Sequence, residues 1–409
     1  MELKTSYQYT YFIYPFAIKE ENYKKYVSNL IKNKNYQIKF FDSFKNVELF
    51  KYFVPNVKKK MFQDFSFTTE KINKFEKLSY NHKLKILEEQ NCLVFEYLLG
   101  DEIQGKIDEK DGIFFTISKV ELVCFKTGIC FLMLKTHLID TNSFEDILNF
   151  NYKFENINFE NKNIKKLDSI KIQTNMFNNI SGISKILEDV AGQKIESNKL
   201  DIDENLFLIY TYACLESSYW NKDSDFENIE NEFIKLAEVK QSSKIINVDY
   251  DKLSMISNAS YMKMRVNNKC AALICSAADS NNYTKLLDKY ENQYLYTYII
   301  AMHQKYYLKK LNKEFENKTQ TTIDNFIKFN NDIWISEITE DSFGQKLYKR
   351  CKEKFNLEEL YNEAKNKYDV FYKKLNIDKN KNLNHIFIIL LTCSLIIGIA
   401  NLCSWLFFR

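Results

Sequence analysis

One run near the C-terminal end constrains this chain most: residues 386–408 contain no Asp, Glu, Lys, Arg or His. A helix rises about 1.5 Å per residue, so a run of this length spans roughly 34 Å and could cross a hydrocarbon core of about 30 Å. Uncharged apolar runs of this length are seldom buried helices of globular domains. We therefore expect a single transmembrane helix at 386–408.

The charges that flank this run predict its orientation. Only Arg409 follows the run, whereas four lysines precede it: Lys373, Lys374, Lys379 and Lys381. Because Lys and Arg are enriched on the cytoplasmic side of membrane helices, residues 1–385 are expected in the cytoplasm. The predicted location is the cell (inner) membrane, with a C-terminal anchor in contact with membrane lipid.

One face of the expected helix carries small and polar residues. Ser394 and Gly398 are four residues apart, and Asn401 follows one turn later. Small residues allow helices to approach closely, and an amide in hydrocarbon needs a partner. These three residues are candidates either for helix packing in a homo-oligomer or for lining a pore formed by several copies, and both interpretations predict self-association.

A second stripe precedes the run, in the segment 331–385. Its apolar positions step by 3, 4, 4, 3 and 4 along a charged helix: Leu357, Leu360, Ala364, Tyr368, Phe371 and Leu375. This spacing is typical of a coiled coil. Two interpretations remain open, because the stripe could pack on the chain's own domain or form a stalk that associates with other copies.

Composition excludes several functional classes. A net charge of +4 in 409 residues is not the strongly basic signature of a nucleic-acid binder, so no direct DNA or RNA binding is expected. Only 8 glycines occur and no glycine-rich phosphate loop is present. The 9 cysteines form no CxxC pair and the 4 histidines are dispersed, so we expect neither metal nor cofactor. No catalytic motif is found, which predicts a protein that is not an enzyme.

The rest of the chain predicts an α+β (α/β) cytoplasmic domain that leads through a long stalk helix into the membrane helix. Residues 1–155 are expected to be β-rich and 156–330 mainly helical. The clearest element is a hairpin of 114–125 and 129–136, because Gly128 can supply the positive φ of a tight turn.

Four further stretches have interpretable patterns. An extended, aromatic-rich segment at 7–18 is expected to stop at Pro15, and 255–278 reads as a strand with a turn. The apolar stretches 203–218 and 286–315 both read as buried helices.

Two basic features are candidates for ligand binding. Lys58, Lys59 and Lys60 follow Pro55 and form either a solvated loop or contacts to an anionic ligand. His303 lies beside Gln304 and Lys305 and is either a ligand-binding residue or a satisfied core histidine.

Several short motifs, taken together, resemble a divergent branch of the CorA-like membrane protein family. They are Phe12-Ile-Tyr-Pro-Phe16, Val120-Glu-Leu-Val-Cys-Phe-Lys-Thr-Gly128, Asp146-Ile-Leu-Asn-Phe-Asn-Tyr-Lys153, Tyr298-Ile-Ile-Ala-Met-His-Gln-Lys305, Trp334-Ile-Ser336, Gly344-Gln-Lys-Leu-Tyr348 and Leu357-Glu-Glu-Leu-Tyr361. The chain departs from CorA transporters in lacking a second membrane helix and the Gly-Met-Asn motif, whose place is taken by Ile397-Gly-Ile-Ala-Asn-Leu402.

The resemblance implies an oligomeric membrane protein whose cytoplasmic sensor domain gates an ion-permeable or membrane-disrupting assembly. Some CorA-like relatives act in antiviral defence, so it also implies a nucleotide second messenger as partner. The departures weigh against the third interpretation, a divalent-cation (Mg²⁺) transporter. The alternative is a tail-anchored binding or scaffold protein with no transport activity.

Overall fold

The computed structural model describes residues 2–62, 68–100, 103–107, 112–155, 170–174, 179–192, 207–244, 255–257, 259–317 and 320–407. Side chains at 174, 179–181, 375–383 and 399–407 lie outside this description. The chain divides into two compact units. Unit 1 comprises Met1–Tyr307 and Ile333–Leu357, and unit 2 comprises Leu308–Asp332 and Glu358–Arg409.

Unit 1 is built on one large mixed sheet, in the order β10-β11-β12-β9-β1-β6-β5-β4-β7-β8. In addition, β3 pairs with β5, and β2 pairs with β3. All these pairs are antiparallel except the parallel pair β12 and β9. The strands are β1 (Thr5–Ala17), β2 (Tyr36–Ile38), β3 (Cys92–Tyr97), β4 (Ile103–Ile107), β5 (Ile113–Phe125), β6 (Ile129–Leu138), β7 (Ile170–Thr174), β8 (Asn179–Gly182), β9 (Leu208–Leu215), β10 (Met255–Ile256), β11 (Met262–Val266) and β12 (Cys270–Ser276).

Helices complete a mixed α/β architecture, which confirms the α/β part of the fold class expected from the sequence. The α-helices are α1 (Glu20–Lys32), α2 (Val47–Tyr52), α3 (Pro55–Met61), α4 (Thr69–Glu76), α5 (Tyr80–Glu89), α6 (Phe144–Glu155), α7 (Ile183–Ala191), α8 (Phe226–Ala237), α9 (Lys285–Lys289), α10 (Leu295–Glu314), α11 (Gln320–Lys328), α12 (Ser342–Lys354) and α13 (Leu357–Phe407). Short helical turns are η5 (Asp223–Asp225), η7 (Ser280–Tyr283), η8 (Tyr290–Tyr294), η9 (Phe315–Asn317) and η10 (Phe329–Ile333). The stretch 156–330, expected to be mainly helical, thus also contributes strands β7 to β12.

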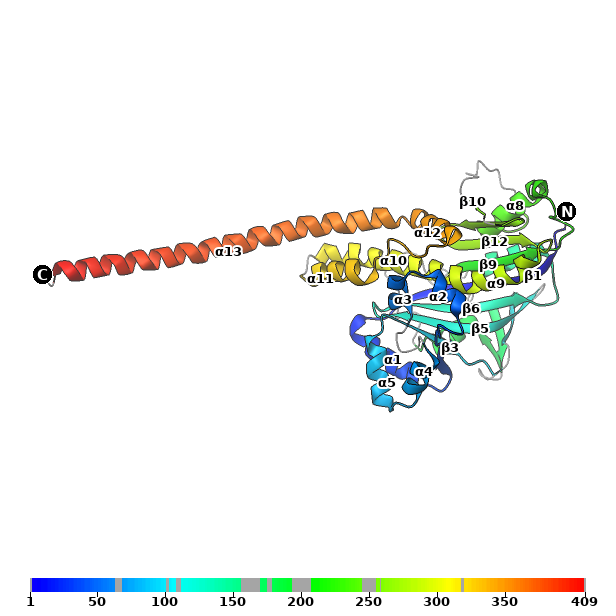
Figure 1. The fold of residues 1–409 in the computed structure, drawn as a ribbon, viewed down its shortest axis with the longest axis horizontal. Helices are drawn as coiled ribbons and strands as arrows, with labels where there is room; N and C mark the ends of the chain where they lie inside the picture. Colours follow the sequence, from blue (N-terminus) through cyan, green and yellow to red (C-terminus); the bar gives the residue numbers. More distant parts are fainter. Residues whose placement is uncertain are drawn as a thin grey trace. The chain divides into compact units, whose positions relative to one another are not determined.

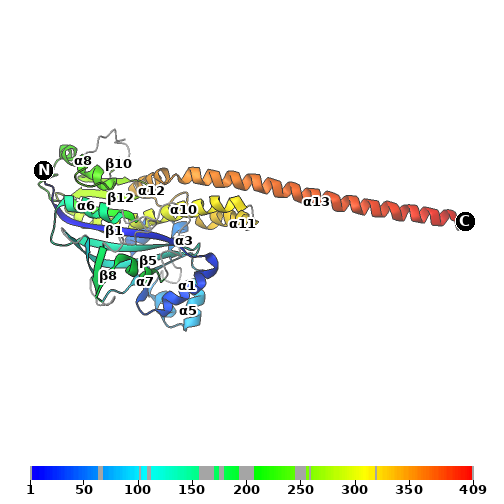
Figure 2. The same cartoon turned by 180° about the vertical axis from the view of Figure 1, so that it is seen from behind.

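The two faces of the sheet are covered by different helices. Side chains alternate between the faces of a strand, so successive residues of β1 enter different layers. Phe12 packs on α6, where its ring stacks on Phe154 at 3.7 Å between centroids. Tyr11, one residue earlier, contacts Glu291 in η8 on the other face. In Figure 1, α9 lies in front of the sheet and is followed by α10. Figure 2, the view from behind, shows α6 and α7 on the opposite face of the sheet.

The predicted hairpin is confirmed and depends on one glycine. Strands β5 and β6 pair in antiparallel register, with Cys124 opposite Cys130. Gly128 has a φ of +83°, and a Cβ there would lie 1.9 Å from the carbonyl oxygen of Ile18. Glycine is therefore needed both for the left-handed conformation and for the close approach of the backbone.

The extended segment near the N-terminus is also confirmed, but it does not stop at Pro15. Strand β1 continues to Ala17, with Pro15 opposite Phe131 of β6. Its pairing with β9 on the other side ends at Ile13. Pro15 thus lies where β1 has only one neighbouring strand and its missing N–H interrupts no ladder, which is where proline is tolerated in a sheet.

The stretch 203–218 contains strand β9 where a helix was expected, and its residues 203–206 lie outside the described part of the chain. Its described core is β9, in which all eight residues are buried. A run that is apolar on both faces carries no alternation, so periodicity alone cannot separate a central strand from a buried helix. The stretch 286–315 is helical as predicted, through α9, η8 and α10, and the strands β10 to β12 confirm the interpretation of 255–278.

Unit 2 consists of the end of α10, α11 and most of α13. Tyr361 donates a hydrogen bond from its hydroxyl to Asn330 at 2.8 Å, and the Tyr368 ring lies 4.8 Å from that of Phe326. Ala364 is fully buried. The described part of the stripe therefore packs on the chain's own helices. Further along α13, large apolar side chains between Ile386 and Ile397 are more than half exposed.

The expected transmembrane helix needs correction. Within the described part of the chain, no helix combines the length and apolar character needed to cross a membrane. A helix that crosses a hydrocarbon core of about 30 Å needs about 20 consecutive, predominantly apolar residues. The predictions of a membrane protein, a transmembrane helix and a C-terminal anchor in the cell membrane are therefore wrong on this finding.

Candidate functional site

A β-bulge in β5 creates the most unusual polar arrangement in unit 1. The register between β5 and β6 shifts between Ile117 and Lys119, so that Ser118 is the extra residue. Before the bulge β5 pairs with β4, and from Val120 onward it pairs with β3. The bulge breaks the alternation that would otherwise hold along the strand. As a result Ile117 faces the apolar core, whereas Lys119 and Glu121 point to the side of the sheet covered by η8.

This shift places two lysines directly opposite each other. Lys119 of β5 pairs in register with Lys135 of β6. Like charges opposite each other on neighbouring strands repel and destabilise a sheet. The repulsion is offset by a carboxylate that comes from another element, Glu291 of η8.

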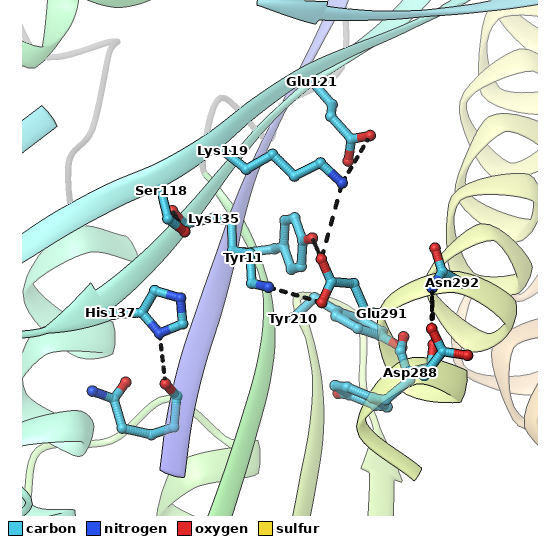
Figure 3. Close-up of polar contacts among 12 residues, drawn as sticks. Tyr11, Ser118, Lys119, Glu121, Lys135, His137, Tyr210, Asp288, Glu291 and Asn292 are labelled. Carbon is cyan, nitrogen blue, oxygen red and sulfur yellow. Dashed lines mark hydrogen bonds and ion pairs between the residues drawn. The ribbon is translucent and has the colours of Figure 1, made fainter. Parts of the chain in front are cut away.

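Glu291 bridges three donors from three strands (Figure 3). Its Oε2 accepts from Lys135 at 2.8 Å, and its Oε1 accepts from the Tyr11 hydroxyl at 2.8 Å and lies 3.9 Å from the Lys119 Nζ. Burial raises the pKa of Glu291, but Lys135, Lys119 and the Tyr11 hydrogen bond outweigh it and hold the pKa below its usual value. Glu291 is therefore an anion at neutral pH.

The helix that presents Glu291 is irregular at this point. Residues 290–294 form a π-helical turn between α9 and α10, in which the N–H of Leu295 reaches back to the carbonyl of Tyr290. The Tyr290 carbonyl also accepts from the Tyr210 hydroxyl at 2.7 Å. π-helical turns are uncommon and occur often at functional sites. Here the turn directs both Tyr290 and Glu291 at the sheet.

A second carboxylate extends the network inward. Glu121 is almost completely buried and accepts from Lys39 at 2.7 Å, and Lys119 lies 3.3 Å away. Burial raises the pKa of Glu121, but the two lysines lower it further, so the net shift is downward. Lys39 also donates to the Tyr296 hydroxyl at 3.1 Å. Lys119 therefore lies between two carboxylates, the buried Glu121 and the partly exposed Glu291.

A layer of buried tyrosines forms the floor beside Lys135. The Tyr9 ring stacks on Tyr212 at 5.4 Å between centroids, and the ammonium group of Lys135 lies 4.7 Å from the centre of the Tyr9 ring. Burial raises the pKa of Tyr9 and of Tyr11 well above the usual value, so both phenols stay protonated. The Tyr9 hydroxyl is fully buried and has no hydrogen-bond partner among the described residues. A buried hydroxyl without a partner is energetically costly.

One end of the network is partly open to solvent. The side chains of Lys119, Lys135 and Glu291 are 24%, 13% and 21% exposed. Next to them, the rings of Tyr7 and His137 lie 5.7 Å apart, and both side chains are partly exposed. The network holds the ammonium groups of Lys39, Lys119 and Lys135 and the carboxylates of Glu121 and Glu291, which leaves one excess positive charge.

Comparison with known proteins identifies neither a family nor a function for this chain. No protein-family model, curated protein or solved structure matches this chain. The resemblance to CorA-like proteins is therefore still a prediction, and the site has to be interpreted from its own geometry.

The structure places the residues singled out in the sequence elsewhere. Lys58, Lys59 and Lys60 form the last turn of α3 and not a loop, and Lys60 donates to the Trp334 carbonyl at 3.1 Å. In α13, the Ser394 hydroxyl donates to the Leu391 carbonyl at 2.8 Å. Among the described residues, no atom outside the adjacent helix backbone lies within 4 Å of a Cβ built on Gly398.

Other candidates are buried or fall outside the described side chains. Leu357 is fully buried in unit 1, and Leu360 and Phe371 of α13 are partly buried. The side chains of Leu375 and Asn401 lie outside the described residues. The pore-lining or packing role of Ser394, Gly398 and Asn401, and self-association through the stripe, stay predictions.

His303 is buried, and one of its ring nitrogens has a hydrogen-bond partner. Its Nε2 lies 2.9 Å from the Thr127 hydroxyl, and its ring stacks on Phe125 at 3.7 Å between centroids. Burial lowers the pKa of His303 to about 3, so the ring is neutral at physiological pH. This environment fits a structural histidine and is separate from the lysine network.

The sequence did carry a signal for the site that we find. Tyr7, Tyr9 and Tyr11 alternate along one strand, and Lys119 and Glu121 are two residues apart within an otherwise apolar strand. This period of two indicates one polar strip on a buried face. Its partner, Glu291, could not be assigned because it is far away along the chain.

Proposed function

We propose that unit 1 is a ligand-binding sensor domain, and that Lys119, Lys135 and Tyr11 bind the anionic group of a small molecule. The observation that carries this proposal is the direct opposition of Lys119 and Lys135, two partly exposed lysines on the face of the sheet that η8 covers. Such opposition destabilises a structural sheet, whereas it is useful for binding an anion with several oxygens.

The surroundings favour a nucleotide over a simple anion. The partly exposed rings of Tyr7 and His137 offer aromatic surface beside the two lysines. Aromatic side chains stack on nucleobases, while ammonium groups pair with phosphates. A nucleotide would combine both contacts. The resemblance to nucleotide-gated members of the CorA-like group supports the same ligand class.

The proposal is tested by isothermal titration calorimetry of the full chain with ATP, pyrophosphate and adenosine. We expect ATP to bind more tightly than either fragment. Lys119→Ala and Lys135→Ala should each weaken ATP binding by about tenfold or more, because each removes a charge-assisted contact worth roughly 1.5–3 kcal/mol. Near-UV circular dichroism shows whether the variants keep their fold.

Two control variants locate the site. Lys24 is 70% exposed on α1, and Lys24→Ala should leave ATP binding unchanged. Lys59→Ala tests the basic run chosen from the sequence. Binding that depends on Lys59 and not on Lys119 or Lys135 would move the site to α3. Absence of ATP and pyrophosphate binding to the wild-type chain would refute the proposed function.

A further inference from the structure

Glu291 occupies the position in which an oxyanion would be held. Its carboxylate receives the Tyr11 hydroxyl and the Lys135 ammonium group at 2.8 Å each, with Lys119 at 3.9 Å. These donors come from strands β1, β6 and β5. Figure 3 shows the carboxylate of Glu291 reaching toward these strand residues from the helix.

The element that carries Glu291 is suited to releasing it. The π-helical turn at 290–294 makes the backbone hydrogen bond from Leu295 to Tyr290 in place of the usual α-helical pattern. Tyr290 itself is fixed to the sheet, because its hydroxyl donates to the carbonyls of Thr211 and Ala271 at 2.9 and 3.0 Å. Glu291 is partly exposed, and its side chain can turn to water without moving this tyrosine.

We infer that Glu291 is an internal competitor of the ligand, so that the Glu291–Lys135 ion pair and phosphate binding exclude each other. This inference rests on the proposed function, since it concerns the regulation of the same site. Glu291 keeps Lys119 and Lys135 neutralised while the site is empty. Only a ligand that presents a phosphate to both lysines displaces it, which selects against weakly charged molecules.

A pair of charge-matched variants tests the inference, with pyrophosphate as the probe. Glu291→Gln removes the competing charge, whereas Asp288→Asn removes the same charge from the same helical segment. Asp288 accepts from Asn292 at 2.8 Å and makes no described contact with the two lysines. We expect Glu291→Gln to bind pyrophosphate about tenfold more tightly than the wild type, and Asp288→Asn to change the affinity less than twofold.

Thermal melting provides a second measurement. In Glu291→Gln, Lys135 faces Lys119 without its own carboxylate partner, so 10 mM phosphate should raise the melting temperature of this variant more than that of the wild type or Asp288→Asn. Equal tightening in both variants would assign the effect to overall charge and overturn the inference. Weaker binding in Glu291→Gln would show that Glu291 organises the site and does not compete.

The outcomes separate this inference from the proposed function. Wild-type binding that requires Lys119 and Lys135 but is unchanged in Glu291→Gln removes the inference alone. Absence of pyrophosphate binding in the wild type and in both variants removes both proposals. Wild-type binding that requires both lysines and becomes tighter in Glu291→Gln, but not in Asp288→Asn, supports both proposals.

Discussion

Protonation of the unfolded chain at His303 should make unit 1 less stable in mild acid. His303 is 5% exposed, stacks on Phe125 and pairs with the Thr127 hydroxyl. Burial lowers the pKa of His303 to about 3, whereas a histidine in the unfolded chain has a pKa of about 6.5. Between these two values the unfolded chain binds a proton that the folded chain does not, so stability falls as the pH falls.

The magnitude follows from the two pKa values. At this position the unfolded chain is about one quarter protonated at pH 7 and almost fully protonated at pH 5, while the folded chain remains neutral. The resulting loss of stability is about 2 kcal/mol, and it continues at about 1.4 kcal/mol per pH unit until the pH approaches 3.

The assay compares the wild type with His303→Gln, which can still pair with Thr127 but does not titrate. Urea unfolding followed by near-UV circular dichroism gives the free energy of unfolding at pH 7 and pH 5. The wild type should lose about 2 kcal/mol more than the variant over this range. The other titrating groups cancel in this difference.

A second reading comes from nuclear magnetic resonance of the histidine ring protons. The His303 signal should not titrate above pH 4 in the folded protein. Equal losses of stability in the two proteins, or a His303 signal that titrates near pH 6, would refute the reasoning.

Three further predictions concern stability. Gly128→Ala should lower the free energy of unfolding in urea by more than about 3 kcal/mol, since it combines a positive φ with a backbone clash. Gly192→Ala, at φ +65° without a clash, should lower it by only about 1 kcal/mol. Equal losses in the two variants would exclude the close approach of the backbone as a cause. Lys39→Met should lower the free energy of unfolding by about 3 kcal/mol, because buried Glu121 then lacks one of its cationic partners. Combining Lys39→Met with Glu121→Leu should recover most of this stability, and a double variant less stable than the single one would contradict the prediction. Tyr290→Phe should cost about 1 kcal/mol through the lost hydroxyl hydrogen bond, and an unchanged urea midpoint would count against that bond.

Local sequence signals predicted local structure well. The turn at Gly128 was identifiable because only one residue type tolerates its conformation, and it fixed the register of β5 and β6. The segment 286–315 was identifiable as a helix from its spacing, although the π-helical turn within it gives no comparable sequence signal.

Features that depend on distant partners could not be predicted in the same way. The apolar run of β9 is a strand because β1 and β12 lie on either side of it. The bulge at Ser118 reverses which residues of β5 face the core, and strict alternation does not reveal it. The candidate site depends on both the bulge and a glutamate from η8, so its components only meet in the folded chain.

The place of β1 in the sheet has a consequence for synthesis of the protein. This strand leaves the ribosome before both of its neighbours, β6 and β9, which follow more than 100 residues later. Its apolar and aromatic side chains therefore lack their sheet neighbours while that part of the chain is made, and such long-range pairing is slow. Strand β1 is thus paired on both sides only after β9 has emerged, and until then its unpaired edges favour aggregation of the nascent chain.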